Sequence, residues 1–181
     1  MDEDQRWRLL SAAAEALAER GYARTRVADI VSRVRVSRGV IYEYFDDVPD
    51  CLLAAHEMVG DCILDLVSSA CEEGQGWSAG LRLALDGVLE FLATEPSFAH
   101  LLGPEAAAAV PAIASARERL VRKLADFGAD RHAVEGAMLF VADRVAAGAA
   151  ADVPALARQL VELIRPAAGG PERPPRGAPA T

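Results

Sequence analysis

Residues 34–45 read VRVSRGVIYEYF, a segment with the features of a short helix that has one buried and one exposed side. Ser37 is of a residue type that favours the N-cap position, so we expect the helix to begin just after it. Ile41 and Phe45 are four residues apart and therefore share one side of such a helix. Arg38 lies on the other side, with a tyrosine four residues later. The segment therefore predicts a helix anchored by apolar side chains that presents basic and aromatic groups outward.

Two further helices are expected before this segment. Between residues 6 and 20, leucines and alanines recur at the spacing of one helix face, and Gly21 follows as a stop signal. Thr25 is expected to cap the second helix by accepting hydrogen bonds from its first backbone N–H groups. A break near Arg35 separates the second helix from the third. Three short helices, the last two joined by a turn of a few residues, are typical of a helix-turn-helix unit.

The rest of the chain predicts six more helices, which makes the fold all-α with about nine helices. Asp47 is the expected cap of a long fourth helix that has Pro49 in its first turn and runs to about Cys71. Gly103-Pro104 predicts an interruption between later helices. The remaining helices are expected at residues 78–94, 96–102, 111–127, 131–149 and 153–164.

These helices divide into two predicted domains and a tail. Residues 1–47 contain the helix-turn-helix unit, and residues 48–165 form a second helical domain. Residues 166–181 are rich in proline, glycine and charge, and they cannot bury enough apolar surface to order themselves. We therefore expect a disordered tail.

The charge of the chain is unevenly distributed. The net charge of −8 at pH 7 would by itself argue against a nucleic-acid partner, because polyanions bind electropositive surfaces. From Arg20 to Phe45, however, six arginines stand against only Asp29 and Glu43. Basic charge is thus concentrated in the helix-turn-helix unit.

Other functional classes find little support in the sequence. It has no nucleophile motif, phosphate-binding glycine loop or His and carboxylate cluster with ligand spacing, so no catalytic residue, metal or cofactor is expected. Cys51, Cys62 and Cys71 are odd in number and are expected to be reduced thiols of a cytosolic protein. No apolar run approaches the length that spans a bilayer, so we expect a cytoplasmic protein without a membrane partner.

The third helix has the side chains of a helix that binds in the DNA major groove. Arg38, in its first turn, can contact guanine through two hydrogen bonds, and Gly39 allows the backbone to approach the groove wall. Val40 suits a thymine methyl group, and tyrosine hydroxyls suit phosphate oxygens. Taken alone, the segment fits a solvated helix with aromatic packing equally well. The predicted DNA-contacting residues are Thr25, Arg26, Ser37, Arg38, Gly39, Val40, Tyr42 and Tyr44.

Residues 9–53 resemble the DNA-binding domain of the tetracycline-repressor (TetR) family of bacterial transcription regulators. The resemblance rests on LLSAAAEALAERGY at 9–22, on Thr25, Val27 and Asp29-Ile30, on VSRGVIYEYF at 36–45, and on Leu52-Leu53. It implies a homodimer, usually a repressor, that leaves a palindromic double-stranded operator when a small molecule binds its variable second domain. The residues from 48 to 165 would then bind the effector and dimerise.

Four positions depart from the family pattern, and they support an alternative function. Arg35 replaces a common glycine, Val40 a usual threonine, and Val48 a usual lysine that would contact phosphate. Glu43 stands where a basic or aromatic residue is frequent, and it would repel phosphate if it faces the DNA backbone. The alternative is a dimeric helical small-molecule sensor or protein-binding module whose DNA specificity is weak or lost.

The resemblance also implies a ligand pocket and a dimer interface in the second domain. Aromatic and methionine side chains at helical spacing more commonly belong to an ordinary core, and polar groups that could orient a ligand are few. The candidate ligand-binding residues are Met58, Cys62, Phe91, Phe98, His100 and Met138.

Two apolar stripes on the last two predicted helices are the candidates for dimerisation. From the stripes alone, the core of a single chain could absorb both of them equally well. The resemblance implies instead that the two helices form half of an intermolecular four-helix bundle. The residues concerned are Val134, Val141, Val145, Val153, Leu156, Leu160 and Leu163.

Overall fold

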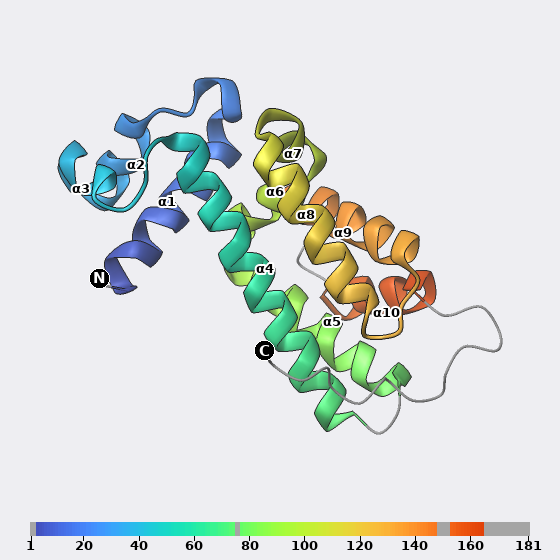
Figure 1. Ribbon diagram of the computed structural model, residues 1–181. Helices are drawn as coiled ribbons and strands as arrows, with labels where there is room; N and C mark the ends of the chain where they lie inside the picture. The colour runs from blue at the N-terminus through green and yellow to red at the C-terminus, as the bar shows by residue number, and fades with distance from the viewer. Residues whose placement is uncertain (1–2, 75–76, 148–152, 165–181) are drawn as a thin grey trace.

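The computed structural model describes residues 3–74, 77–147 and 153–164 (Figure 1). These residues form helices and connecting turns without a strand among them, which confirms the all-α prediction. The predicted tail, residues 166–181, lies outside the described residues. Within them, the helices are α1 Glu3–Arg20, η1 Tyr22–Arg24, α2 Val27–Val34, α3 Arg38–Tyr42, α4 Val48–Glu73, α5 Trp77–Thr94, η2 Pro96–Phe98, α6 Ala99–Leu102, α7 Pro104–Ala109, α8 Pro111–Ala125, α9 Arg131–Ala146 and α10 Val153–Ile164.

The first three helices gather at one end of the molecule around a small apolar core (Figure 1). Leu9, Leu10 and Leu17 of α1 and Ile30 of α2 are buried, and the two helices pack against each other. Ile41 of α3 closes the same core. Burial of these side chains fixes α2 and α3 relative to α1, as the helix-turn-helix prediction requires.

The start of α2 differs from its prediction. Arg26, not Thr25, is the N-cap residue, and its backbone N–H donates to Oδ2 of Asp29 over 2.9 Å. The hydroxyl of Thr25 donates instead to the carbonyl oxygens of Gly21 at 2.9 Å and Ala16 at 3.3 Å. Thr25 therefore fastens α2 to the end of α1 and does not cap the second helix.

The turn between α2 and α3 passes through Arg35, whose backbone is left-handed with φ 60°. The next N–H, that of Val36, donates to the carbonyl of Val31 over 3.1 Å, which closes the end of α2. Nη2 of Arg8 in α1 donates to the carbonyl of Val34 over 3.0 Å. The backbone of the turn is thus held on both sides.

α3 is shorter than expected, because it ends at Tyr42 and not at Phe45. The chain leaves the helix in a turn in which the N–H of Phe45 still donates to the carbonyl of Ile41 over 2.9 Å. Phe45 remains buried, as predicted.

α4 connects this end of the molecule to the rest (Figure 1). Oδ1 of Asp47 accepts from the N–H of Asp50 over 2.8 Å, which confirms the predicted cap. α4 packs against α1 near its start and against α5 and α8 along its length. One hydrophobic core runs through both regions, and the domain boundary between residues 47 and 48 stays a prediction.

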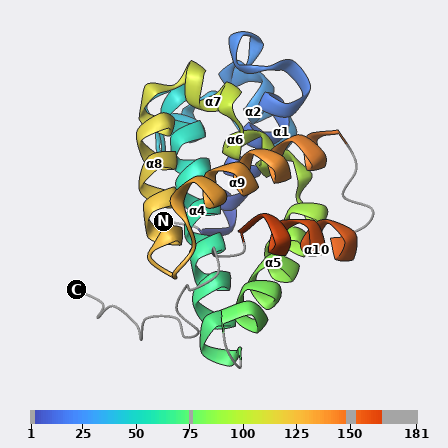
Figure 2. The ribbon, with the colours of Figure 1, turned by 90° about the vertical axis from the view of Figure 1, so that its right-hand side faces the viewer.

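The second region contains a helix that was not predicted. Pro104 and Pro111 each stand in the first turn of a helix, so the interruption at Gly103-Pro104 is followed by the six-residue α7 before α8 begins. α9 and α10 pack on each other, and α10 also packs against α5 (Figure 2). No helix among residues 3–74, 77–147 and 153–164 is long and apolar enough to cross a membrane.

Candidate functional site

The outer side of α3 is open to solvent. Ser37, Arg38 and Gly39 at its start are exposed, and Tyr42 one turn later is 58% exposed. Ile41, on the other side of the same helix, is buried. The helix is thus anchored from one side and presents a basic and a phenolic side chain on the other, as the sequence predicts.

The arginines around α3 differ in how firmly they are held. Arg33 pairs with Glu19 and lies 3.6 Å, Nε to Oε2, from Glu15. Arg35 and Arg38 are exposed, and neither has an ion-pair partner within the described part of the chain. Their guanidinium groups can therefore contact an external anion without breaking an internal contact.

A groove of about 340 Å³ lies where the start of α2, the end of α3 and the start of α4 meet. Arg26, Tyr42 and Val48 line it. The N-termini of α2 and α4 carry partial positive charge, which favours an anion such as phosphate, but the Asp47 carboxylate also lines the groove and caps α4. The groove brings together residues that lie up to 27 positions apart in the sequence, from Tyr22 to Pro49.

Three of the predicted DNA-contacting side chains, those of Thr25, Arg26 and Tyr44, make hydrogen bonds inside the protein. Nη1 of Arg26 donates to the carbonyls of Ala23 at 2.9 Å and Thr25 at 3.0 Å, although the side chain stays exposed. Thr25 is 3% exposed, because its hydroxyl bonds to the end of α1. The hydroxyl of Tyr44 donates to Oε1 of Gln5 over 3.2 Å, and its ring centroid lies 6.2 Å from that of Phe45. Val40 is half-buried. Neither hydroxyl is available to phosphate in this arrangement, whereas Arg26, Ser37, Arg38, Gly39 and Tyr42 are exposed.

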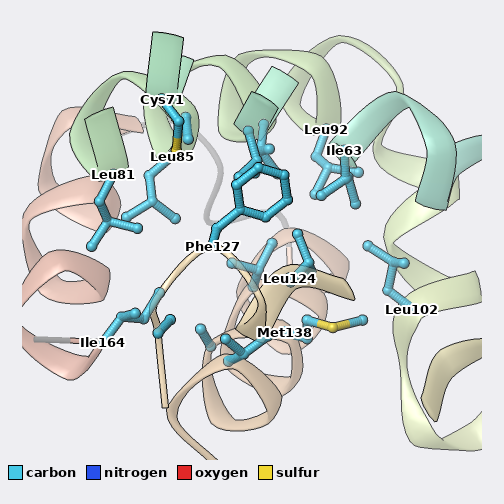
Figure 3. A pocket seen from close by; sticks show the side chains of 17 residues that line it. Ile63, Cys71, Leu81, Leu85, Leu92, Leu102, Leu124, Phe127, Met138 and Ile164 are labelled. Carbon is cyan, nitrogen blue, oxygen red and sulfur yellow. The ribbon is translucent and has the colours of Figure 1, made fainter. Parts of the chain in front are cut away.

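A second candidate site is an apolar cavity of about 110 Å³ between α4, α5, α8, α9 and α10 (Figure 3). Ile63 of α4, Leu85 of α5 and Phe127 after α8 point into it (Figure 3). No charged side chain lines it in the described part of the chain. A cavity of this kind binds apolar groups, since a buried polar group would lack a partner there.

Of the six candidate ligand-binding residues, Met138 lines this cavity. Met58 and Cys62 line a separate groove on the opposite side of α4. Phe98 is fully buried, with its ring centroid 6.0 Å from that of Phe91 and 5.5 Å from that of Trp7. His100 is half-buried on α6 and does not line the cavity. The structure therefore does not bring these six residues together.

Several lining residues that are not among the six candidates come from α5. Leu81, Leu85, Val88 and Leu92 follow one another at spacings of four, three and four, so they share one face of that helix. This periodicity was the available signal. It marks a buried face, but it does not reveal that a void lies against that face.

The cysteine thiols are poorly suited to nucleophilic chemistry. Burial, with a smaller contribution from the nearby Asp50 carboxylate, raises the pKa of Cys51 to about 12 from its ordinary value of 9.0. Burial also raises the pKa of Cys71, which lines the apolar cavity. All three cysteines are free thiols. They stay protonated at neutral pH and behave as small apolar side chains.

His56 of α4 is 1% exposed and makes one specific contact. Its Nδ1 lies 3.0 Å from the carbonyl oxygen of Leu101, so this nitrogen carries the proton and donates. Its Nε2 is buried and has no hydrogen-bond partner in the described part of the chain. Burial lowers the pKa of His56 below 6.5, which keeps the imidazole neutral and leaves Nε2 an acceptor.

The predicted dimerisation residues are largely occupied within one chain. Val134, Val141 and Val145 of α9 are buried, as are Leu156 and Leu160 of α10. The side chains of Val153 and Leu163 lie outside the described ones. α9 packs with its buried stripe against α6 and α8, and α10 packs against α5 and α9. Of the two interpretations left open by the sequence, burial in the chain's own core is the one observed for these five residues.

The comparison with known sequences concerns the N-terminal region. Residues 9–55 match the model of the bacterial regulatory proteins of the tetR family. The HTH-type transcriptional regulator HbdR of Aromatoleum sp. (strain CIB) is 37% identical over 59 residues, which are 33% of this chain and 26% of that protein. The match thus spans about a quarter of that relative.

Solved structures are similar over most of the chain. The regulator FadR from Bacillus subtilis, in complex with stearoyl-CoA, has a TM-score of 0.68 at 20% identity and covers 88% of this chain and 97% of its own. A TetR-like transcriptional regulator from Rhodococcus sp. RHA1 has a TM-score of 0.65 at 23% identity. This match covers 88% of the present chain and 93% of the regulator. At these identities the likeness establishes the fold alone. Residues 9–55 thus match the N-terminal region of the tetR family of bacterial regulatory proteins, and the described residues share their fold with TetR-like regulators.

Proposed function

We propose that the protein is a ligand-responsive repressor that binds a palindromic operator as a homodimer and leaves it when an apolar effector binds. The observation that carries this proposal is the outer side of α3, where Arg38 and Tyr42 are exposed while Ile41 anchors the helix. Such a protein acts where the operator is, in the cytoplasm of a bacterial cell.

Base contacts are assigned to the start of α3 and phosphate contacts to its surroundings. Arg38 would donate to O6 and N7 of a guanine, and Gly39 would let the helix enter the groove closely. Arg26 and Tyr42, which line the groove beside the N-terminus of α4, would contact the DNA backbone. We leave the hydroxyls of Thr25 and Tyr44 out of this set, because both are bonded within the protein.

The dimer interface is assigned to the sides of α9 and α10 that face away from the chain's own core. These two helices form the face turned to the viewer in Figure 2. Leu139 of α9 is 38% exposed, and a side chain added at Gly136 would meet nothing within 4 Å. Phe140 is half-buried beside them. An exposed leucine next to a glycine lets a second helix approach closely, and a two-fold arrangement would place two copies of α3 about 34 Å apart.

The effector is assigned to the apolar cavity. An engineered cavity of about 150 Å³ in another protein binds benzene, so a cavity of this size takes a small apolar molecule or a slender aliphatic group. The similar FadR structure contains stearoyl-CoA, which has a long aliphatic chain. We therefore favour an effector whose apolar part enters between α4 and α5, where a long chain would require the cavity to widen.

α4 is the element through which binding would change DNA affinity. Ile63 and Val67 of this helix line the cavity, and its first turns pack against α1. A ligand that fits one tilt of α4 better than another shifts the population toward that tilt. The two α3 helices of the dimer would then be spaced wrongly for both half-sites, and the DNA would be released.

The alternative is a dimeric sensor whose DNA specificity is weak, and two positions favour it. Glu43 is exposed directly after α3, where its carboxylate would face phosphate. Val48 occupies the first position of α4 and supplies no charge to the groove that it lines.

One experiment separates the two functions. The purified protein selects its preferred duplex from a random pool, and its affinity for that duplex and for a shuffled duplex is measured over a range of salt. An operator binder enriches a palindrome and prefers it over the shuffled duplex. The logarithm of its affinity falls linearly with the logarithm of the salt concentration. Equal and weak affinity for both duplexes supports the alternative. Apolar molecules that release the selected duplex then identify the effector class.

A further inference from the structure

The six arginines between Arg20 and Phe45 differ in whether their guanidinium groups already have a partner. Arg35 and Arg38 make neither a hydrogen bond nor an ion pair with another group in the described part of the chain. The other four are held by ion pairs or by hydrogen bonds to backbone carbonyls: Arg20, Arg24, Arg26 and Arg33. Since Arg38 is assigned to a base, Arg35 is the free arginine without a proposed role.

The backbone of Arg35 is left-handed, with φ 60°, a conformation that glycine adopts more easily. An L-residue is strained there because its Cβ approaches the following carbonyl oxygen. Strained residues cluster at sites where the side chain serves a function. The exposed side chain of Arg35 offsets no strain through a hydrogen bond or an ion pair within the described residues. The function of this side chain therefore lies in a contact with another molecule.

The turn holds Arg35 at a defined place on the surface beside α3. Val34 before it is buried, and Val36 after it packs against the hydrophobic core. The hydrogen bonds made by the N–H of Val36 and by Nη2 of Arg8 fix the backbone on both sides of the residue. Arg35 is thus exposed between two residues that face the core, three positions before Arg38.

We propose that Arg35 contacts a phosphate of the DNA backbone at the edge of the major groove that α3 enters. Arg35 meets DNA only if α3 does, so this assignment rests on the proposed function. When the first turn of a helix reaches base edges, the turn that precedes it lies over the sugar–phosphate backbone bordering the groove. A guanidinium can donate two parallel N–H groups to phosphate oxygens. Such a contact carries no sequence information, in contrast to the base contact of Arg38.

Three substitutions separate the charge of Arg35 from its backbone strain. Arg35→Lys keeps the positive charge and Cβ, Arg35→Ala keeps only Cβ, and Arg35→Gly removes both. DNA affinity should follow the charge, whereas the stability of the protein should follow Cβ. Arg35→Gly is therefore expected to weaken DNA binding in a protein that is at least as stable as the wild type, so unfolding cannot explain the loss.

The test measures affinity over a range of salt for the selected palindrome and for its shuffled duplex. Arg35→Ala and Arg35→Gly should each lower the affinity for both duplexes about tenfold or more at about 0.1 M salt. The slope of log affinity against log salt should become shallower by about 2, because each phosphate contact contributes about 0.9 and a dimer loses two contacts. Arg35→Lys should keep the wild-type slope. Arg122→Ala removes the same charge from an exposed position on α8 and should change neither quantity.

Failure of this assignment can be told apart from failure of the operator function. If the protein selects a palindrome but Arg35→Ala and Arg35→Gly keep the wild-type affinity and slope, only the role of Arg35 is overturned. If no palindrome is selected and both variants still lose affinity and slope on every duplex, the phosphate contact is supported and the operator function is contradicted. An equal loss in Arg122→Ala, or a loss confined to one base pair, overturns the phosphate contact. A wild-type protein that binds no duplex overturns both.

Discussion

Among the described residues, Arg35 alone combines a side chain with a left-handed backbone, at φ 60°. An L-residue in this conformation is strained by about 1 to 2 kcal/mol relative to glycine, because Cβ approaches the following carbonyl oxygen. The strain is retained in a turn that sets the angle between α2 and α3. An arginine there adds a charge close to the proposed DNA surface.

Replacing Arg35 by glycine is expected to raise the free energy of unfolding by up to about 1 kcal/mol, after allowing for the greater freedom of glycine in the unfolded chain. Urea denaturation measures the change. Arg35→Ala is the matched control, since it removes the same charge but keeps Cβ. Equal stability of the two variants would contradict the strain argument.

The buried thiol of Cys51 predicts a loss of stability in alkali. Its pKa is raised to about 12 in the folded protein from 9.0, so above about pH 9 the unfolded chain loses a proton that the folded chain retains. The free energy of unfolding should therefore fall as pH rises from about 9 toward 12, by at most about 1.4 kcal/mol per pH unit. Urea titrations at several pH values measure the slope. Cys51→Ala should flatten it, and an unchanged slope would contradict the assignment.

At the scale of single residues, the sequence predicted burial better than it predicted contacts. The i to i+4 spacing of Ile41 and Phe45 identified both as core residues, and both are buried. The role of Thr25 could not be read in the same way, because a hydroxyl donates to a nearby carbonyl as readily as it caps a helix. Its partner, Gly21, is set by how the chain turns after α1.

At the scale of elements, helical periodicity predicted the long helices because each repeats its apolar spacing over several turns. α7 has six residues and so little periodicity that only Pro104 marks its start. The apolar cavity was equally out of reach, because a void depends on how five helices fit together. Periodicity identifies the faces of α5 and α9, and packing decides whether those faces touch.

The crossing of α4 and α5 depends on two glycines. A Cβ added at Gly74 would lie 2.5 Å from the backbone of Gly80, and backbone cannot rotate away as a side chain can. Gly74→Ala is therefore expected to destabilise the protein by about 1 to 3 kcal/mol in urea denaturation. The neighbouring exposed residue supplies the control, Glu73→Ala, which should change stability little. An unchanged free energy of unfolding in Gly74→Ala would contradict this prediction, because it would show that α4 and α5 can shift apart without loss of stability.

At the scale of the whole molecule, binding to a palindromic operator requires two copies of α3 held at a fixed distance. The apolar stripes of α9 and α10 suggested an interface, but they are buried in the chain's own core. A period of 3.6 residues shows that a helix has an apolar face and does not show whether the neighbour belongs to the same chain. The proposed interface therefore moves to the outer side of α9, around Leu139.

Leu139→Arg is expected to convert the dimer to a monomer in sedimentation velocity and to weaken binding to the selected palindrome. Leu83→Arg is the matched control, because Leu83 is 47% exposed on α5 and lies outside the proposed interface. A Leu139→Arg protein that remains dimeric would place the interface elsewhere. A wild-type chain that sediments as a monomer would contradict the two-copy arrangement.

The replacement Arg38→Ala shows whether the outer side of α3 contacts base edges. The affinity is measured for every single-base variant of the selected duplex and compared between the wild type, Arg38→Ala and Arg122→Ala. Arg122 is exposed on α8 and serves as the control. We predict that Arg38→Ala costs about 1 to 3 kcal/mol and removes discrimination at one base pair in each half-site, leaving the other positions unchanged. An Arg38→Ala protein with wild-type affinity and an unaltered preference at every position would contradict the claim.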